Sequence, residues 1–272
     1  MTDSNVSESP LSSLFNAYST DALAADKAAA ERDGSGVRNL TMSKLDPGAY
    51  DFRFLPPPVG QTSPFLIRHT HFVKGGEKVR AVPCARLGKG ERCLVCEEVE
   101  RLEATGNATD AKVADDMDAN FSVQAVVLDL ALPFNPTAPT AQLAVLEFKK
   151  TVHTALMGIR ANVRGGGDFT HPVTGFPIAV TKSGAGMNTD YKVGASMAAP
   201  RGLLAPTEAA AVAILQNAPD IFAVKYMTDD EVNTILAEAG MGGEPSAPPA
   251  RGAGGAGAML GSNFGTSART PR

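Results

Sequence analysis

Long apolar runs and paired cysteines are both missing from this sequence, and each absence excludes a class of protein. No run approaches the roughly 18–20 apolar residues that a membrane-spanning helix needs. Residues 1–9 are polar and acidic with no apolar stretch behind them, so we expect no secretory signal. The three cysteines are an odd number within residues 84–96, which argues against a disulfide framework and for a reducing compartment. We therefore expect a cytoplasmic protein without a membrane partner.

The motifs of several enzyme classes are missing too. The sequence has no Walker A loop, no strand-linked G-x-G-x-x-G and no G-x-S-x-G. The run Gly165 to Gly167 is followed by Pro172 rather than by Lys-Ser/Thr, which is typical of a turn. There is no H-E-x-x-H, and Arg92 stands before Cys93 where the nucleobase deaminases have proline. These absences predict that the protein is not an enzyme.

The net charge of −4 conceals an uneven distribution along the chain. Residues 71–92 carry six basic against two acidic side chains, and residues 147–201 carry seven against three. Residues 97–120 and 202–240 are acidic, with eight against two and six against one. An acidic chain with basic blocks can still bind a polyanion, because local potential steers the ligand. The alternative is a solvated charged surface, and charge patterning alone does not decide between the two.

Composition divides the chain into three parts. Residues 1–44 form an acidic arm, in which the Ala-rich stretch 21–32 predicts a helix. Residues 45–240 form the expected folded region. From residue 241 the composition shifts to Gly, Ala, Pro and Ser without periodicity, which indicates a disordered tail.

Within the folded region, short patterned segments outnumber long ones. Alternating apolar and polar residues predict strands at 50–55, 65–73, 121–130, 143–148, 177–182 and 191–193. Helices are expected at 97–105, 151–160, 206–217 and 228–239, the last opened by a capping box. The predicted class is mainly β with added helices (α+β), which suits a small barrel carrying insertions.

The sharpest local motif is His71-x12-Cys84-x8-Cys93-x2-Cys96. A Cys-x2-Cys pair places two thiolates on one turn, so that both reach a tetrahedral Zn2+. Four protein ligands leave no open position for water, so we expect one structural zinc ion. Three buried free thiols are the alternative, although this basic, Gly-rich segment is a poor place for a core. His69 lies on the same strand face as His71, and periodicity alone does not choose between them.

The residues resemble a known family, the single-stranded-DNA-binding (helix-destabilising) proteins of T-even-type bacteriophages. The segment from Phe52 to Pro56 is similar to the opening strand of that family. Pro64-Phe65-x5-His71-x12-Cys84, followed by Cys93-Leu-Val-Cys96-Glu97, resembles its zinc subdomain. A softer match runs from Asp168 through Lys182 to Tyr191 and resembles a late barrel hairpin. The resemblance covers about residues 45–240.

This resemblance implies a fold, a ligand and a set of partners. The fold is an OB-fold barrel with an inserted zinc-binding subdomain at about 65–105, and single-stranded DNA lies in a groove between them. The family's metal histidine follows the Pro-Phe pair at this distance, which favours His71. The function implied is to coat single-stranded DNA without sequence specificity during phage replication, recombination and repair, in the host cytoplasm. Phage replication and recombination proteins, and self-association along the strand, are the further partners implied.

The chain departs from the family at both ends. The family's acidic C-terminal tail is replaced by a Gly/Ala tail with Arg251, Arg269 and Arg272. Its short basic N-terminal motif, which drives cooperative binding, has no clear counterpart within residues 1–40. In the family, cooperativity and the usual partner contacts depend on these two segments.

Sequence-neutral strand binding needs basic side chains for phosphates and exposed rings for bases. The residues that we expect to contact DNA are Arg53, Arg68, Phe72, Lys74, Lys78, Phe121, Lys149, Lys150, Lys182, Tyr191 and Lys192. Phe148 is a further candidate ring, and Tyr191 is preferred because charged residues flank it. Core packing is the alternative for each ring, and with no Trp and only 6% aromatics the affinity leans on charge. A competing function is a zinc-stabilised replication or transcription accessory module that binds a protein partner.

Overall fold

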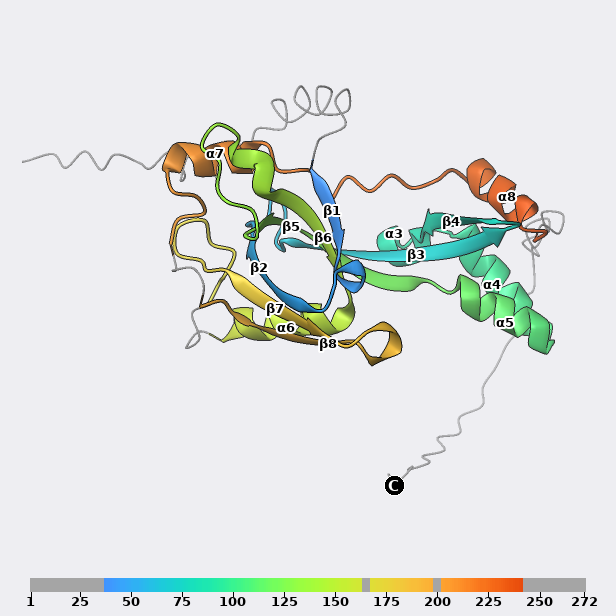
Figure 1. Ribbon diagram of the computed structural model, residues 1–272. Coiled ribbons are helices and arrows are strands. Elements are labelled where there is room, and N and C mark those ends of the chain that lie inside the picture. The colour runs from blue at the N-terminus through green and yellow to red at the C-terminus, as the bar shows by residue number, and fades with distance from the viewer. Residues whose placement is uncertain (1–36, 163–166, 198–201, 242–272) are drawn as a thin grey trace, which may run out of the picture.

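A computed structural model describes residues 37–162, 167–197 and 202–241 (Figure 1). Residues 1–36 of the expected arm and the tail expected from residue 241 fall outside these ranges, apart from Met241 itself, and most of the Gly165–Gly167 turn does as well. Residues 38–44, which we expected in the arm, instead form a strand paired with the sheet and a 3-10 turn. The described chain is a mixed α/β structure built mainly on sheet. The α+β class is therefore confirmed.

The described elements are short, as the sequence pattern predicts. The strands are β1 (Arg38–Thr41), β2 (Gly48–Phe54), β3 (Phe65–Gly75), β4 (Lys78–Pro83), β5 (Asn120–Asp129), β6 (Leu143–Phe148), β7 (Ile178–Ser183) and β8 (Asp190–Ala195). The helices are α3 (Ala85–Lys89), α4 (Leu94–Ala104), α5 (Ala108–Met117), α6 (Lys150–Ala161), α7 (Glu208–Gln216) and α8 (Asp229–Glu238), with 3-10 turns at Met42–Lys44, Pro139–Gln142 and Gly186–Asn188. Of the helices in these ranges, none has the length and apolar character to cross a membrane.

The strands form one sheet with the order β1-β6-β5-β2-β7-β8, and β3 joins it by pairing with β5 and β4. Its β7-β2-β5-β6 portion is antiparallel throughout and has the spatial order of a Greek key. β1 pairs with β6 in parallel. Because β1 and β8 end the path of strands in the part of the chain that the structure describes, the sheet does not close into a barrel.

A cluster of phenylalanines lies in the main hydrophobic core against this sheet. The ring of Phe54 meets those of Phe65, Phe148 and Phe169 edge-on, with centroids 6.0, 6.3 and 5.5 Å apart. Such pairs contribute about 0.5–1.5 kcal/mol each beyond the area they bury. All four rings are buried, so Phe148 is a core residue rather than a ring open to a ligand.

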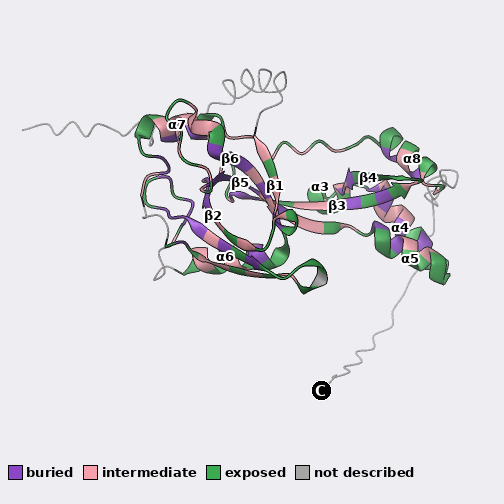
Figure 2. Ribbon diagram, viewed as in Figure 1, coloured by how far each residue is buried: buried purple, intermediate pink, exposed green. Residues whose placement is uncertain are grey.

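The molecule has two lobes (Figure 1). The sheet lobe comprises β1, β2 and β5–β8 with α6 and α7. The cysteine lobe comprises the far half of β3 together with β4, α3, α4, α5 and α8. β3 belongs to both, because Phe65 lies in the core of the sheet lobe and Val73 in the core of the cysteine lobe. Figure 2 shows buried residues along the sheet and again where β3 meets α4.

The cysteine lobe is larger than the sequence indicates. Its core takes Ala114 and Met117 from α5, and Val232 and Leu236 from α8, beyond the expected limits of about 65–105. The capping box of α8 is present: the Thr228 side chain accepts from the Glu231 N–H, and the Glu231 side chain accepts from the Thr228 N–H. The sequence predicted this helix and its cap, but not that it packs on the cysteine lobe.

Candidate metal centre and nucleic-acid surface

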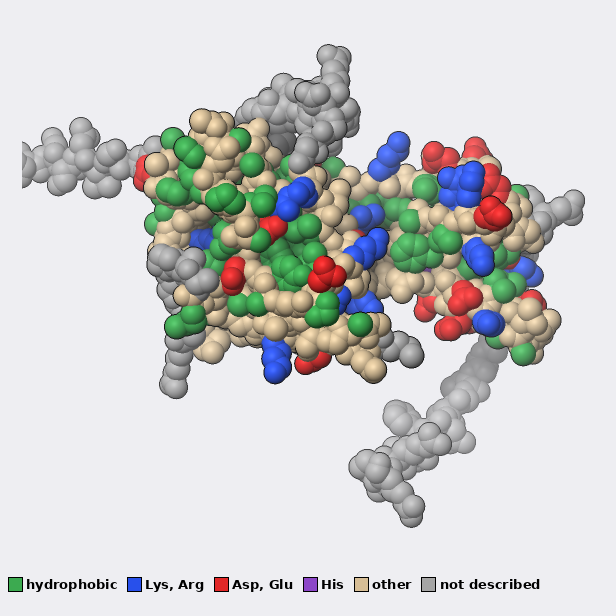
Figure 3. Space-filling view, viewed as in Figure 1, with side chains coloured by type: hydrophobic (Ala, Val, Ile, Leu, Met, Phe, Trp, Pro, Cys, Tyr) green, Lys and Arg blue, Asp and Glu red, His purple; other side chains and the backbone are tan. Residues whose placement is uncertain are grey.

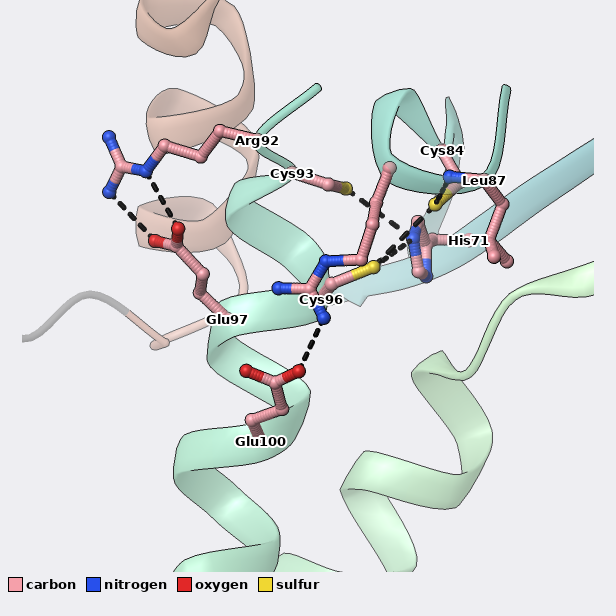
Figure 4. Close-up of polar contacts among 9 residues, drawn as sticks. His71, Cys84, Leu87, Arg92, Cys93, Cys96, Glu97 and Glu100 are labelled. Atoms are coloured by element: carbon pink, nitrogen blue, oxygen red, sulfur yellow. Dashed lines mark hydrogen bonds and ion pairs between the residues drawn. The ribbon is translucent and has the colours of Figure 1, made fainter. Parts of the chain in front are cut away.

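His71 and the three cysteines meet in the cysteine lobe (Figure 4). Their ligand atoms all lie within 4.8 Å of one another. His71 Nε2 is 3.6 Å from Cys93 Sγ and 3.4 Å from Cys96 Sγ, and Cys84 Sγ is 3.5 Å from Cys96 Sγ. On a tetrahedron with ligands ~2.0–2.3 Å from zinc, neighbouring ligand atoms are about 3.3–3.8 Å apart. The cluster is compatible with one structural metal ion.

Local structure explains how the four side chains converge. The alternation of β3 points His71 to the same side as Val73, into the lobe. Cys84 precedes α3, where its sulfur accepts a hydrogen bond from the Leu87 N–H at 3.4 Å. Cys93 is the N-cap residue of α4 and Cys96 lies in its first turn. Sulfurs at helix N-termini are favoured as thiolates, the form that binds metal.

The competing histidine lies elsewhere. His69 packs its ring edge-on against Phe121, with centroids 5.4 Å apart, and is not part of the cluster. The alternative that periodicity left open is thus decided in favour of His71.

The pKa values of His71 and the cysteines depend on one another. Burial works against charge on His71, but the hydrogen bonds with Cys93, the Met117 carbonyl and Cys84 together outweigh it and raise the pKa of His71 to about 9. Burial likewise opposes the thiolate of Cys93, yet the hydrogen bond and charge of His71, with backbone N–H groups of Cys96 and Ala85, together lower the pKa of Cys93 to about 6. Burial raises the pKa of Cys96, and its neighbour Cys84 adds to the effect. Without a metal, the cluster therefore favours an imidazolium–thiolate pair.

The basic block around the cysteines is largely neutralised by nearby carboxylates. Arg92 makes two hydrogen bonds of 2.7 Å with Glu97, and Arg86 pairs with Glu100. Further ion pairs are Arg92–Asp229 and Arg80–Glu238, each at 3.8 Å, and Lys89–Glu91. Among the described residues, no carboxylate oxygen lies within 4 Å of the amines of Lys74 and Lys78. The local excess of charge is therefore smaller than the sequence count implies.

One face of β3 carries basic and aromatic side chains between the lobes. Arg68, Phe72 and Lys74 alternate along the strand and therefore share a face. Lys74 is exposed, Phe72 is 42% exposed and Arg68 is half-buried. Figure 3 shows Lys and Arg side chains near the junction of the lobes on the face in view.

The strand register widens this face into the sheet lobe. Arg68 pairs with Ser122 of β5. On the other side of β5, Val123 pairs with Phe148, so the exposed Lys149 continues β6 beside Ser122. A row of Arg68, Ser122 and Lys149 thus crosses the sheet. Ser122 was not among the predicted contacts, because nothing in its local sequence sets it apart.

Arg53 and Lys182 are corrections to the predicted DNA contacts. Arg53 is 3% exposed, and its guanidinium donates to the carbonyls of Phe169, His171 and Gly202 at 2.7, 2.7 and 3.2 Å. Lys182 is 7% exposed, and its amine donates to the carbonyls of Ser43 and Leu45. Both cations are turned inward to satisfy buried backbone oxygens, which removes them from any outer surface.

The remaining residues that we predicted to contact DNA do not share one face of the molecule. Phe121 and Tyr191 are half-buried against the sheet-lobe core, so the preferred ring, Tyr191, is not the exposed one. Lys78 lies opposite Gly75 and so on the other face of the β3–β4 hairpin from Lys74. Lys150 and Lys192 are exposed, on the first turn of α6 and on β8.

No protein-family model matches the chain, and a search of curated proteins finds no match.

Proposed function

We propose that this protein binds single-stranded DNA without sequence specificity, as the phage helix-destabilising proteins that its sequence resembles do. The observation that carries the proposal is the face of β3 that joins the two lobes. There Arg68, Phe72 and Lys74 offer cations and an exposed ring on one strand. A strand binder needs this combination, because every phosphate is anionic and every base has a stacking face.

The topology supports an OB-fold for the sheet lobe. An OB-fold is a partly open, five-stranded Greek-key barrel that binds oligonucleotides on the face of strands 2 and 3, with loops 1–2 and 4–5 beside it. If β2 is the first strand, then β5 and β6 are strands 2 and 3, and β7 and β8 are strands 4 and 5. Apart from α8, which comes after strand 5, the cysteine lobe then lies in the connection between strands 1 and 2. The row Arg68–Ser122–Lys149 would occupy the usual ligand face.

The metal in this proposal is zinc with a structural role. His71, Cys84, Cys93 and Cys96 would hold it, and soft thiolates with one imidazole are a donor set that zinc prefers. Since all four positions are filled by protein, the ion supplies folding energy rather than a reaction. The function that we propose therefore includes no catalysis.

Fluorescence anisotropy with labelled DNA tests the function. We expect binding to single strands of any composition above a minimum length, weaker binding to duplex, and log Kd rising with log salt at ~0.7 per phosphate contact. Arg68→Glu should weaken binding to every sequence alike, while Lys112→Glu on the exposed side of α5 serves as the matched control. Equal affinity for duplex, or equal loss in both variants, would sink the proposal.

A protein-binding accessory module is the second candidate, and the open edge of β4 favours it. β4 pairs only with β3 in the described chain, and Val79 on it is 59% exposed. Open edges are sites where a partner adds a strand. A protein of this kind would bind no homopolymer at any length, which separates the two candidates in the same titration.

A further inference from the structure

The chain crosses between the lobes once more after the sheet is complete. Residues 217–228 contain no helix or strand and lead from α7 to α8 (Figure 1). Near its start, Ile221 packs against a cluster of the sheet lobe that includes Ile214 of α7. At its end, Thr228 caps α8, which belongs to the cysteine lobe. This return segment is therefore fixed to both lobes.

Tyr226 fastens the return segment to α3. A Cβ atom placed on Gly88 would lie 2.1 Å from the Tyr226 hydroxyl oxygen, so the ring presses directly on the helix backbone. Lys89 Nζ lies 4.3 Å from the centroid of the same ring, a cation–π contact. Gly88 and Lys89 stand between Cys84 and Cys93. Tyr226 thus touches the turn that two of the proposed metal ligands bracket.

α8, which follows the return segment, makes further contacts with the cysteine lobe. Its Val232 and Leu236 are buried with Val73 of β3. Asp229 at its start and Glu238 at its end pair with Arg92 and Arg80 of the cysteine lobe. The return segment and α8 are therefore held by the elements that the metal ligands organise.

We infer that Tyr226 is a latch that sets the spacing of the two lobes and so positions the DNA-binding face. Within the described chain, the lobes are otherwise joined through β3 and β5, and a two-stranded connection twists more than a wide sheet. The latch holds the outer half of β3, with Phe72, in a fixed relation to Lys149 on the sheet lobe. This inference rests on the proposed function for its DNA part only; the latch itself is a property of the fold.

The close contact with Gly88 gives a suppressor test. Gly88→Ala places a methyl group against the Tyr226 hydroxyl, whereas Tyr226→Phe removes that oxygen and leaves ring atoms at 3.1–3.2 Å. Hydrogen exchange of the zinc-loaded full chain would follow the amides of residues 229–238. We expect Gly88→Ala to speed their exchange about tenfold or more, and Gly88→Ala with Tyr226→Phe to restore most of the protection.

Tyr226→Ala removes the contact with α3 without introducing a steric clash, and so tests the same inference independently. Protection of α8 should fall, and single-strand affinity should drop about three- to tenfold, while zinc content and protection of β3 stay at wild-type levels. A merely structural role would lower zinc content and β3 protection together. Unchanged α8 exchange in Tyr226→Ala, or no rescue in the double variant, would overturn the inference. If Tyr226→Ala alters hydrogen exchange of α8 but neither the wild type nor any variant binds DNA, the proposed function is overturned and the role of Tyr226 in the fold stands.

Discussion

His71 donates a hydrogen bond from Nδ1 to the carbonyl oxygen of Met117 at 2.8 Å. Because a carbonyl can only accept, the bond fixes the proton on Nδ1 and leaves Nε2 to face Cys93 and Cys96. The bond also ties the end of α5 to the metal centre. Partners of this kind orient metal-binding histidines in general.

Zinc is expected at one ion per chain, and its loss should unfold the cysteine lobe. Cys93→Ser removes a ligand, so thermal stability should fall and residues 65–119 should become sensitive to protease. His71→Ala should have the same effect, while His69→Ala, whose ring only packs on Phe121, should cost much less. Metal analysis and limited proteolysis under reducing conditions check this; purified protein without zinc would contradict it.

Zinc affinity should rise with pH. In the metal-free chain the pKa of His71 is raised to about 9, so below that pH a proton occupies the nitrogen that zinc needs. The raised pKa of Cys96 places a second proton in competition. Between pH 6 and pH 8 the apparent affinity should therefore increase at least about tenfold per pH unit. Chelator competition at three pH values measures this, and a pH-independent affinity would refute the proton release.

Arg53→Met should destabilise the protein rather than weaken DNA binding directly. Burial lowers the pKa of Arg53 to about 10, against the favourable charge of Asp168. The substitution would remove three charge-assisted hydrogen bonds to carbonyl oxygens, although those of Phe169 and His171 would keep a backbone donor each. We expect a loss of at least about 2 kcal/mol of unfolding free energy. Chemical denaturation measures it. Arg68→Met is the matched control, and it should change DNA affinity with little effect on stability.

Phe72→Ala should weaken single-strand binding by ~1–3 kcal/mol if a base stacks on this ring. Since Phe72 is 42% exposed, the unfolding free energy should change little. Tyr191→Ala should do the opposite, because Tyr191 packs against the sheet-lobe core. Measuring affinity and stability in both variants separates the roles; a larger affinity loss in Tyr191→Ala would show that the strand takes another path.

Reversing Lys149 and Lys150 to Glu should weaken binding to all sequences alike and flatten the salt dependence. Lys149 continues the row beside Ser122, whereas Lys150 begins α6. The single change at Lys149 should therefore account for most of the effect. Salt titrations of both single variants test this, and weakening confined to certain sequences would indicate readout of base edges instead.

The sequence predicted those parts of the structure whose signal is local. Strands at 65–73 and 143–148 lie close to β3 and β6, and the cysteine spacing identified the ligand cluster. β4 and α5 were missed, since a charged edge hairpin and a helix with few large apolar residues show no clear periodicity.

The exposure of basic residues could not be predicted. Arg53 and Lys182 look like their exposed neighbours in the sequence. Their partners are carbonyl oxygens 116–149 and 137–139 residues away along the chain. Such contacts exist only once the whole sheet is assembled, so no local pattern marks them.

Because α8 completes the cysteine lobe, the order of synthesis matters for this protein. The ligands end at Cys96, but Val232 and Leu236 of the same core emerge well over a hundred residues later. During translation the metal site is therefore available long before its lobe is finished, and early metal loading would give α8 a formed surface on which to dock. A nascent chain without metal would instead complete α8 before the surface on which this helix docks has formed.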